Sequence, residues 1–99
     1  MSMSIDQLIS SADIVVFEDP YCPYCIAAKQ ALTSAGHKFA LIAANSGQRS
    51  ELRTKTKVSS VPSIWVKGIY VGGCNDGPQS WMGIKKMIAS GKLNELLNK

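Results

Sequence analysis

The chain has few side chains that could hold a metal ion. It contains one histidine, His37, and three cysteines, Cys22, Cys25 and Cys74. Cys22 and Cys25 have the spacing of half a structural zinc site, but such a site needs four Cys or His ligands. The other candidates, Cys74 and His37, are not spaced as a second pair. We therefore expect no metal site, and the odd number of cysteines also disfavours a secreted, disulfide-bonded scaffold.

Long apolar runs and clusters of basic residues are also missing. No hydrophobic segment approaches the length of a transmembrane helix, and the segment 1–6 shows no basic region followed by an apolar stretch. We therefore expect neither a membrane protein nor a secretory signal. The net charge of +4 favours small anions, but the basic residues are scattered and not interleaved with aromatics, which argues against nucleic-acid binding. A reducing, cytoplasmic location is expected.

One stretch, Cys22-Pro23-Tyr24-Cys25, combines reactive side chains with an informative setting. It follows the apolar run 14–17 and precedes a helix-like segment. A cysteine at such a strand-to-helix junction lies beside free backbone N–H groups, where the helix dipole favours the thiolate. Pro23 suits the first turn of a helix. Cys22 is therefore predicted to be the attacking thiol, and Cys25, one turn later and less exposed, the resolving thiol.

Hydrophobic patterning predicts several short strands and helices. The run at 14–17 is continuously apolar, as in a strand that is buried on both faces, and it is expected to break at Glu18. Lys67-Gly68 has the sequence of a tight hairpin turn. The expected helices are 4–11, 23–35, about 49–57 and about 79–89, with a last helical turn at 93–97, and the expected strands are 14–17, 38–44, 63–66 and 69–71.

The order of these elements predicts an α/β protein with a thioredoxin-like fold. A βαβ unit is followed by a β-hairpin and a helix. Because a helix joins the first two strands, they should be parallel, and the hairpin should complete a four-stranded mixed sheet flanked by helices. Residues 1–99 are expected to form a single domain. Its reactive loop should lie at the carboxyl end of the first strand, where open α/β sheets place their sites.

Four features together resemble the dithiol glutaredoxins, and the resemblance spans nearly the whole chain. They are the hairpin and three motifs: Cys22-Pro23-Tyr24-Cys25, Ser60-Val61-Pro62 and Gly72-Gly73-Cys74-Asn75-Asp76. The resemblance implies a glutathione-dependent oxidoreductase that reduces protein disulfides and glutathione mixed disulfides, with Cys22 as nucleophile and Cys25 as resolving thiol. It also implies glutathione or a related small thiol as co-substrate, disulfide-bonded or glutathionylated proteins as partners, no tightly bound cofactor and a monomer.

The same resemblance implies a set of residues that bind glutathione. Pro62 is expected in the cis form facing the disulfide, and the backbone of Val61 would pair with the backbone of glutathione. Asn75 and Asp76 would hold the γ-glutamyl end. The Asp76 carboxylate suits its ammonium group, and backbone amides at the start of the next helix suit its carboxylate. Asp76 could also act as a plain cap of that helix.

Two further side chains are assigned by the resemblance. Tyr24 would line the groove and cover the thiols, and the guanidinium of Arg49 suits the glycine carboxylate of glutathione, although an exposed arginine is often only a solvated charge. The sequence departs from the family at Asp19, where many relatives carry a lysine that helps to bind this carboxylate. Unless Lys57 compensates, the acidic residue would favour a cationic glutathione conjugate such as trypanothione.

Two other functions use related chemistry. A thioredoxin-type protein reduced by a flavoenzyme is disfavoured because Trp-Cys-Gly-Pro-Cys is absent, whereas Gly72-Gly73 and Asp76 are present. An iron–sulfur carrier would hold a 2Fe–2S cluster with Cys22 of two chains and two glutathiones. It is disfavoured by the rigid Pro23 after the first cysteine, because relatives with this role usually carry a less rigid residue there.

Overall fold

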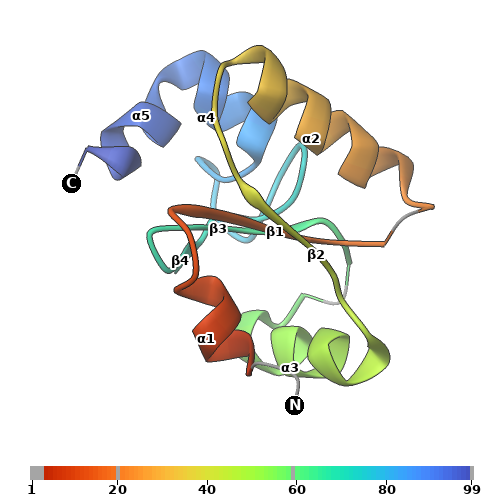
Figure 1. Ribbon diagram of the computed structural model, residues 1–99. Helices are drawn as coiled ribbons and strands as arrows, with labels where there is room; N and C mark the ends of the chain where they lie inside the picture. Colours follow the sequence, from red (N-terminus) through yellow and green to blue (C-terminus); the bar gives the residue numbers. More distant parts are fainter. Residues whose placement is uncertain (1–3, 20, 59, 99) are drawn as a thin grey trace.

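The computed structural model describes residues 4–19, 21–58 and 60–98, which form five helices and four strands (Figure 1). Their order is the predicted one. The elements are α1 (Ile5–Ile9), β1 (Ile14–Glu18), α2 (Pro23–Ser34), β2 (Ala40–Ala43), α3 (Ser46–Thr56), β3 (Ser63–Val66), β4 (Ile69–Tyr70), α4 (Ile84–Ser90) and α5 (Lys92–Leu97).

The four strands form one mixed sheet in the order β2-β1-β3-β4. β1 pairs with β2 in parallel, through Val16 and Leu41, and with β3 in the antiparallel direction, through Val16 and Ile64. Every residue of β1 is buried, as expected for a central strand that is covered on both faces. The predicted break at Glu18 is wrong, because Glu18 pairs with Ala43 as the last residue of β1.

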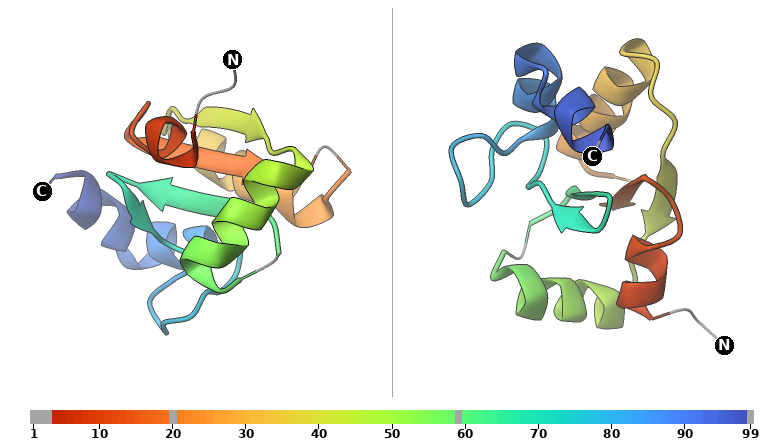
Figure 2. Two further views of the ribbon diagram at one scale, coloured as in Figure 1. Left: turned by 90° about the horizontal axis from the view of Figure 1, so that it is seen from below. Right: turned by 90° about the vertical axis from the view of Figure 1, so that its left-hand side faces the viewer.

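Helices cover both faces of the sheet, so the molecule has three layers (Figures 1 and 2). α2, α4 and α5 lie on one face, and α1 and α3 lie on the other. Successive β1 side chains alternate between these two faces. Val16 packs with Ala28 and Leu32 in the larger apolar cluster, and Phe17 packs with Leu52 in the smaller one. The predicted mixed sheet flanked by helices is confirmed.

Polar caps determine where two of the helices begin. At α1, the Ser4 side chain accepts a hydrogen bond from the backbone of Gln7, whose side chain accepts one from the Ser4 backbone. Asn45 and Gln48 form the same reciprocal pair at α3. This cap explains why α3 begins at Ser46, before the predicted start near 49.

The predicted start of the fourth helix near Gln79 is wrong, because α4 begins only at Ile84. The residue before it, Gly83, has a φ of 108° and cannot continue a helix backward. Its N–H donates to the Val71 carbonyl, and the Ile84 N–H donates to the Gly73 carbonyl, instead of to carbonyls within a helix. Asp76 therefore does not cap α4, and backbone carbonyls that follow β4 hold the start of the helix instead.

The apolar side chains predicted for the last two helices do pack inward, but Trp81 lies in the turn before α4 and not on the helix face that was predicted for it. Trp81 and Ile88 pack against the larger cluster, and Ile84 and Leu93 are buried in it. Over the residues that the structure describes, we find no helix with the length and apolar character needed to cross a bilayer.

Candidate active site

Cys22 occupies the junction between β1 and α2, where it is the N-terminal cap of the helix. Its sulfur accepts a hydrogen bond from the Cys25 N–H at 3.2 Å and lies 3.6 Å from the Val61 carbonyl oxygen. Pro23 follows at the first helical position, as predicted. The positive end of the helix dipole and a backbone donor therefore both stabilise negative charge on this sulfur.

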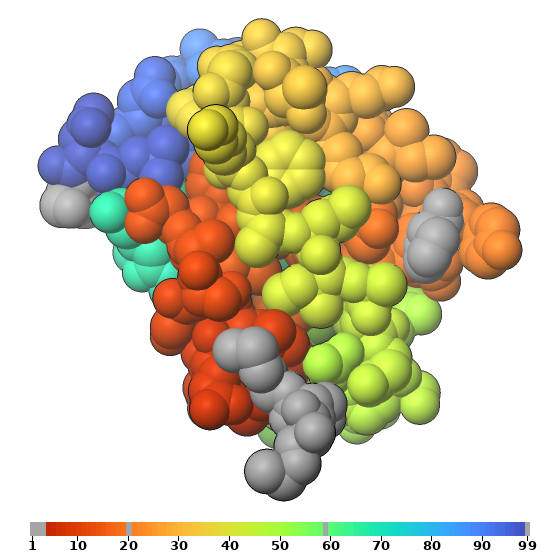
Figure 3. Space-filling model, viewed as in Figure 1, coloured from red at the N-terminus to blue at the C-terminus, as the bar shows by residue number. Residues whose placement is uncertain are grey.

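The segment that carries Cys22 projects from the molecule. In Figure 3 the connection from β1 to α2 forms the tip of the surface at the right. Tyr21 is 93% exposed there, and Cys22 itself is half-buried. A disulfide on another molecule can therefore approach this sulfur from solvent, which agrees with an attacking thiol.

Cys25 differs from Cys22 in its exposure to solvent. It lies within α2, is fully buried, and is a free thiol like Cys22. Burial raises the pKa of the Cys25 thiol to about 12; its hydrogen bond with Cys22 adds to this effect and a backbone hydrogen bond from Asp19 partly offsets it. Cys25 therefore keeps its proton at neutral pH, as expected of a resolving thiol.

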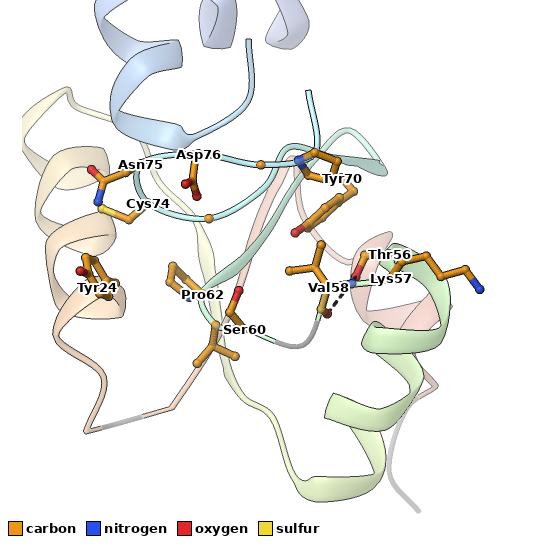
Figure 4. A pocket seen from close by; sticks show the side chains of 14 residues that line it. Tyr24, Thr56, Lys57, Val58, Ser60, Pro62, Tyr70, Cys74, Asn75 and Asp76 are labelled. Carbon is orange, nitrogen blue, oxygen red and sulfur yellow. Dashed lines mark hydrogen bonds between the residues drawn. The ribbon is translucent and has the colours of Figure 1, made fainter. Parts of the chain in front are cut away.

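A cavity of about 640 Å³ is lined in part by Val61, whose carbonyl oxygen is next to Cys22 Sγ (Figure 4). Among the residues that the structure describes, five parts of the chain line it: Tyr24 of α2, residues 56–58 at the end of α3, residues 60–62 before β3, Tyr70 of β4 and residues 73–78. The cavity thus brings together five of the six side chains predicted to bind glutathione, namely Tyr24, Val61, Pro62, Asn75 and Asp76.

The segment Val61–Pro62 connects this cavity to the reactive sulfur. The peptide bond between the two residues is cis, as predicted. The Val61 carbonyl lies next to Cys22 Sγ, while both residues line the cavity. A ligand that lies in the cavity along Val61 would therefore lie close to Cys22 Sγ.

The loop with Asn75 and Asp76 forms the opposite wall. In Figure 4 the Asp76 carboxylate points into the cavity. The Asp76 carbonyl accepts the Gly73 N–H at 2.9 Å, which closes the turn. A side chain at Gly83 would lie 2.5 Å from the Asn75 carbonyl carbon, so the glycine lets α4 support this turn closely.

Tyr70 is a cavity residue that the sequence analysis did not identify. Its hydroxyl points toward the centre of the cavity in Figure 4. Burial raises the pKa of Tyr70, and the nearby Asp76 carboxylate raises it further, so the phenol remains a neutral hydrogen-bond donor. The pairing of Tyr70 with Trp65 could have been predicted from the hairpin. The cavity could not, because loop residues from separate parts of the chain form most of its lining.

Arg49 lies outside this cavity as the described residues define it. Its Nη1 is 3.4 Å from Asp19 Oδ2, and it lines a separate hollow of about 370 Å³ together with Ser46 and Arg53. The contact of Arg49 with a glycine carboxylate stays a prediction. Lys57 does line the main cavity, although its side chain extends away from the centre in Figure 4.

Cys74 lies in the cavity wall as a buried thiol. Burial raises its pKa, so it is a weak nucleophile at neutral pH. Within residues 4–19, 21–58 and 60–98, no three His, Cys, Asp or Glu side chains gather in a way that could hold a metal ion.

Comparison with known proteins places this geometry in a family. A family profile described as Glutaredoxin matches residues 14–71. A glutaredoxin from Pseudomonas aeruginosa is 37% identical over 87 residues, which cover 86% of this chain and 95% of the relative.

Solved structures show the same fold. The holo form of glutaredoxin C1 from Populus tremula x tremuloides has a TM-score of 0.80 and 30% identity, with coverage of 94% of this chain and 82% of the other. A buckwheat glutaredoxin–glutathione complex also has a TM-score of 0.80, with 26% identity and coverage of 94% and 83%. These matches confirm the predicted thioredoxin-like fold.

Glutaredoxins are glutathione-dependent disulfide oxidoreductases, an activity that the paired thiols of α2 suit. With a profile match over more than half of its residues and a close relative over most of its length, the chain belongs to the glutaredoxin family.

Proposed function

We propose that this protein reduces glutathione mixed disulfides and protein disulfides through Cys22 and Cys25, with glutathione as the reductant. The observation that carries the proposal is the position of Cys22, whose sulfur caps α2 beside the cavity wall at Val61. A sulfur in this position can attack a disulfide held in the cavity, and the Cys25 N–H stabilises its negative charge.

In the first step the Cys22 thiolate attacks one sulfur of a disulfide R–S–S–R′. A bond forms between Cys22 and the R sulfur, the original S–S bond breaks, and R′–S⁻ leaves and takes a proton from solvent. With a glutathionylated protein, the attacked sulfur is that of glutathione and the released thiol is that of the protein. This step requires Cys22 alone.

Two routes can then regenerate the enzyme. A second glutathione thiolate can attack the mixed disulfide on Cys22, which releases glutathione disulfide and the Cys22 thiolate. When R is a protein, Cys25 instead attacks Cys22, forms the Cys22–Cys25 disulfide and releases R; two glutathione molecules then reduce this disulfide to two thiols. The buried position of Cys25 and its high pKa suit the second role, because it stays protonated until Cys22 has reacted.

The cavity is the proposed binding site for glutathione. The structurally similar buckwheat protein was solved as a glutathione complex, and the cavity offers the groups that glutathione needs. The Val61 backbone suits the peptide groups of the ligand, the Asp76 carboxylate suits its ammonium group, and Tyr24 and Tyr70 provide walls. Because Asp19 is paired with Arg49, its charge is partly neutralised, so it is a weaker reason to prefer a cationic conjugate than the sequence alone indicates.

The test is reduction of a glutathione mixed disulfide with glutathione as the only reductant. Cys22→Ser should be inactive, because the attacking sulfur is lost. Cys25→Ser should retain this activity and lose the reduction of protein disulfides. Circular dichroism checks that both variants fold.

Equal loss of activity in the two variants would contradict the assigned roles. Brown colour and dimerisation after anaerobic reconstitution with iron and sulfide would instead support the iron–sulfur carrier.

A further inference from the structure

The hydroxyl of Tyr70 is a hydrogen-bond donor that faces the main cavity. In Figure 4 it points toward the centre of the cavity, and the Asp76 carboxylate points into the same space. Among the described residues that line the cavity, none forms a hydrogen bond with this hydroxyl. Because burial and the charge of Asp76 raise the pKa of Tyr70, the phenol keeps its proton and can donate it to an acceptor on a ligand.

The ring of Tyr70 is held in place by the hairpin. It packs on Trp65, its partner in the pairing of β3 with β4, with the ring centroids 5.3 Å apart and the planes inclined by 50°. Trp65 is only 8% exposed, and its Nε1 donates to Ser63 Oγ at 3.1 Å. A donor on a packed ring loses little conformational freedom when it binds an acceptor, so more of the hydrogen-bond energy is available for affinity.

The polar neighbours of Tyr70 at this end of the cavity are engaged or extend away. The Thr56 hydroxyl donates to the Leu52 carbonyl at 2.8 Å and accepts the Val58 N–H at 3.1 Å. The Lys57 side chain extends away from the centre in Figure 4. Within the part of the chain that the structure describes, Tyr70 is therefore the side-chain donor that remains available at this end.

The carboxylate of the γ-glutamyl group needs a donor that the start of α4 does not supply. Backbone amides at the start of this helix were expected to bind it. Three of these amides are instead bonded to backbone carbonyls that follow β4: Gly83 to Val71, Ile84 to Gly73 and Lys85 to Cys74. They are therefore not available to a ligand.

The chemistry of the γ-glutamyl group suits the space between Asp76 and Tyr70. This group carries an ammonium and a carboxylate on one carbon atom, so two complementary partners must lie near each other. The Asp76 carboxylate suits the ammonium. The carboxylate of the ligand needs a donor that adds no negative charge beside Asp76, and the neutral phenol of Tyr70 meets this requirement.

We propose that Tyr70 determines the specificity of this protein for γ-glutamyl thiols, because its hydroxyl donates to the carboxylate of the γ-glutamyl group while Asp76 holds the ammonium. The inference rests on the proposed function and deepens it. It adds to the site a side chain from β4, on the opposite side of the cavity from Tyr24 in Figure 4. A ligand without the γ-glutamyl group gains nothing from this hydroxyl.

The test measures the attack by Cys22 alone. In a Cys25→Ser background, reduced protein is mixed with a symmetrical disulfide and quenched with acid at increasing times, and mass spectrometry follows the mixed disulfide on Cys22. Three disulfides are compared: those of glutathione, of γ-glutamylcysteine, which lacks the glycine, and of cysteinylglycine, which lacks the γ-glutamyl group. The dependence of the rate on disulfide concentration separates binding from the limiting rate of attack.

Tyr70→Phe removes the hydroxyl and keeps the ring that packs on Trp65. With the disulfides of glutathione and γ-glutamylcysteine, the second-order rate constant should fall about tenfold through a higher half-saturating concentration, because a hydrogen bond to a charged group is lost. The limiting rate should stay the same, and so should the reaction with the cysteinylglycine disulfide. Tyr21→Phe is the matched control. It removes the same hydroxyl from a side chain that is 93% exposed and should change none of the rates.

Each other outcome overturns the proposal in a distinct way. Equal losses with all three disulfides indicate that the hydroxyl supports the structure of the site, and unchanged rates with all three indicate that it binds nothing. A loss with glutathione that γ-glutamylcysteine does not share places Tyr70 at the glycine end. If the parent protein reacts equally with all three disulfides, the thiol chemistry stands but the γ-glutamyl group is not recognised. If the parent forms no mixed disulfide with any of them, the proposed function fails first, and the role of Tyr70 with it.

Discussion

Two ion pairs of the same length lie on opposite faces of the sheet. Lys29 and Glu18 are 2.7 Å apart beneath α2, and Lys55 and Asp6 are 2.7 Å apart between α3 and α1. The carboxylate side chain is 10% exposed in the first pair and 76% exposed in the second. Because water and salt screen an exposed pair far more than a buried one, equal distances do not imply equal energies.

The difference extends to the two faces as a whole. The face covered by α2, α4 and α5 carries the larger apolar cluster, the three cysteines and the buried carboxylate. The face covered by α1 and α3 carries a smaller apolar cluster and a surface ion pair. The first face therefore holds the chemistry in a tightly packed environment, and the second mainly supports the sheet.

The largest expected effect is a difference between two leucine truncations. Leu32→Ala removes a fully buried side chain from the α2 face and should lower the free energy of unfolding by about 4 kcal/mol. Leu52→Ala, on the α3 face, removes the same atoms from a smaller cluster and should cost about 2.5 kcal/mol. Urea unfolding measures both. A larger loss for Leu52→Ala would reverse the assignment of the main core.

The two ion pairs give the next test. Lys29→Met leaves the Glu18 carboxylate buried without its countercharge and should lower the free energy of unfolding by about 2 kcal/mol, less than for a fully buried pair because Lys29 is 28% exposed. Lys55→Met should cost less than about 0.5 kcal/mol. Thermal unfolding at low and high salt would distinguish the two pairs, because salt should weaken the exposed pair more than the buried one. Equal, salt-sensitive losses would show that both pairs are surface pairs.

The third comparison is the pH dependence that Cys25 gives to the α2 face. The pKa of Cys25 is about 12 in the folded protein, against an ordinary value of 9.0 in the unfolded chain. Between these values the unfolded chain binds fewer protons than the folded protein, so stability falls as pH rises. Cys25 contributes a slope of about 1.4 kcal/mol per pH unit in this range.

Unfolding of the wild type and of Cys25→Ser at several pH values between 8 and 11 isolates this contribution, because other groups cancel in the difference. The wild type should lose stability more steeply above pH 9. Parallel profiles would mean that Cys25 is not buried as a thiol.

Local sequence signals were sufficient for most of the fold. The apolar run at 14–17, the Lys67-Gly68 turn and the strand-to-helix position of Cys22 each depend on neighbouring residues, and each was predicted correctly. The start of α4 was not, because it depends on hydrogen bonds between Gly83 and Val71 and between Ile84 and Gly73. Such bonds join residues 11 and 12 positions apart in the chain and leave no periodic pattern.

The site shows the same division. The motifs identified five residues that line the cavity, because each motif lies at the end of an element near the carboxyl end of β1. The pairing of Arg49 with Asp19 and of Lys29 with Glu18 could not be predicted, because each joins two elements whose relative rotation depends on packing. Glu18 in particular is a charged residue next to a proline-containing segment, which predicts an exposed loop, yet it is buried in the structure.

The capping role of Cys22 has a further consequence for the backbone. The same sulfur that reacts also accepts the Cys25 N–H and closes the first turn of α2. A thiolate is a stronger acceptor than a disulfide sulfur, so oxidation weakens this cap and lowers the local opening free energy of the turn. Amide hydrogen exchange at Cys25 would then be faster in the oxidised protein, which makes one backbone proton a reporter of the redox state of the enzyme.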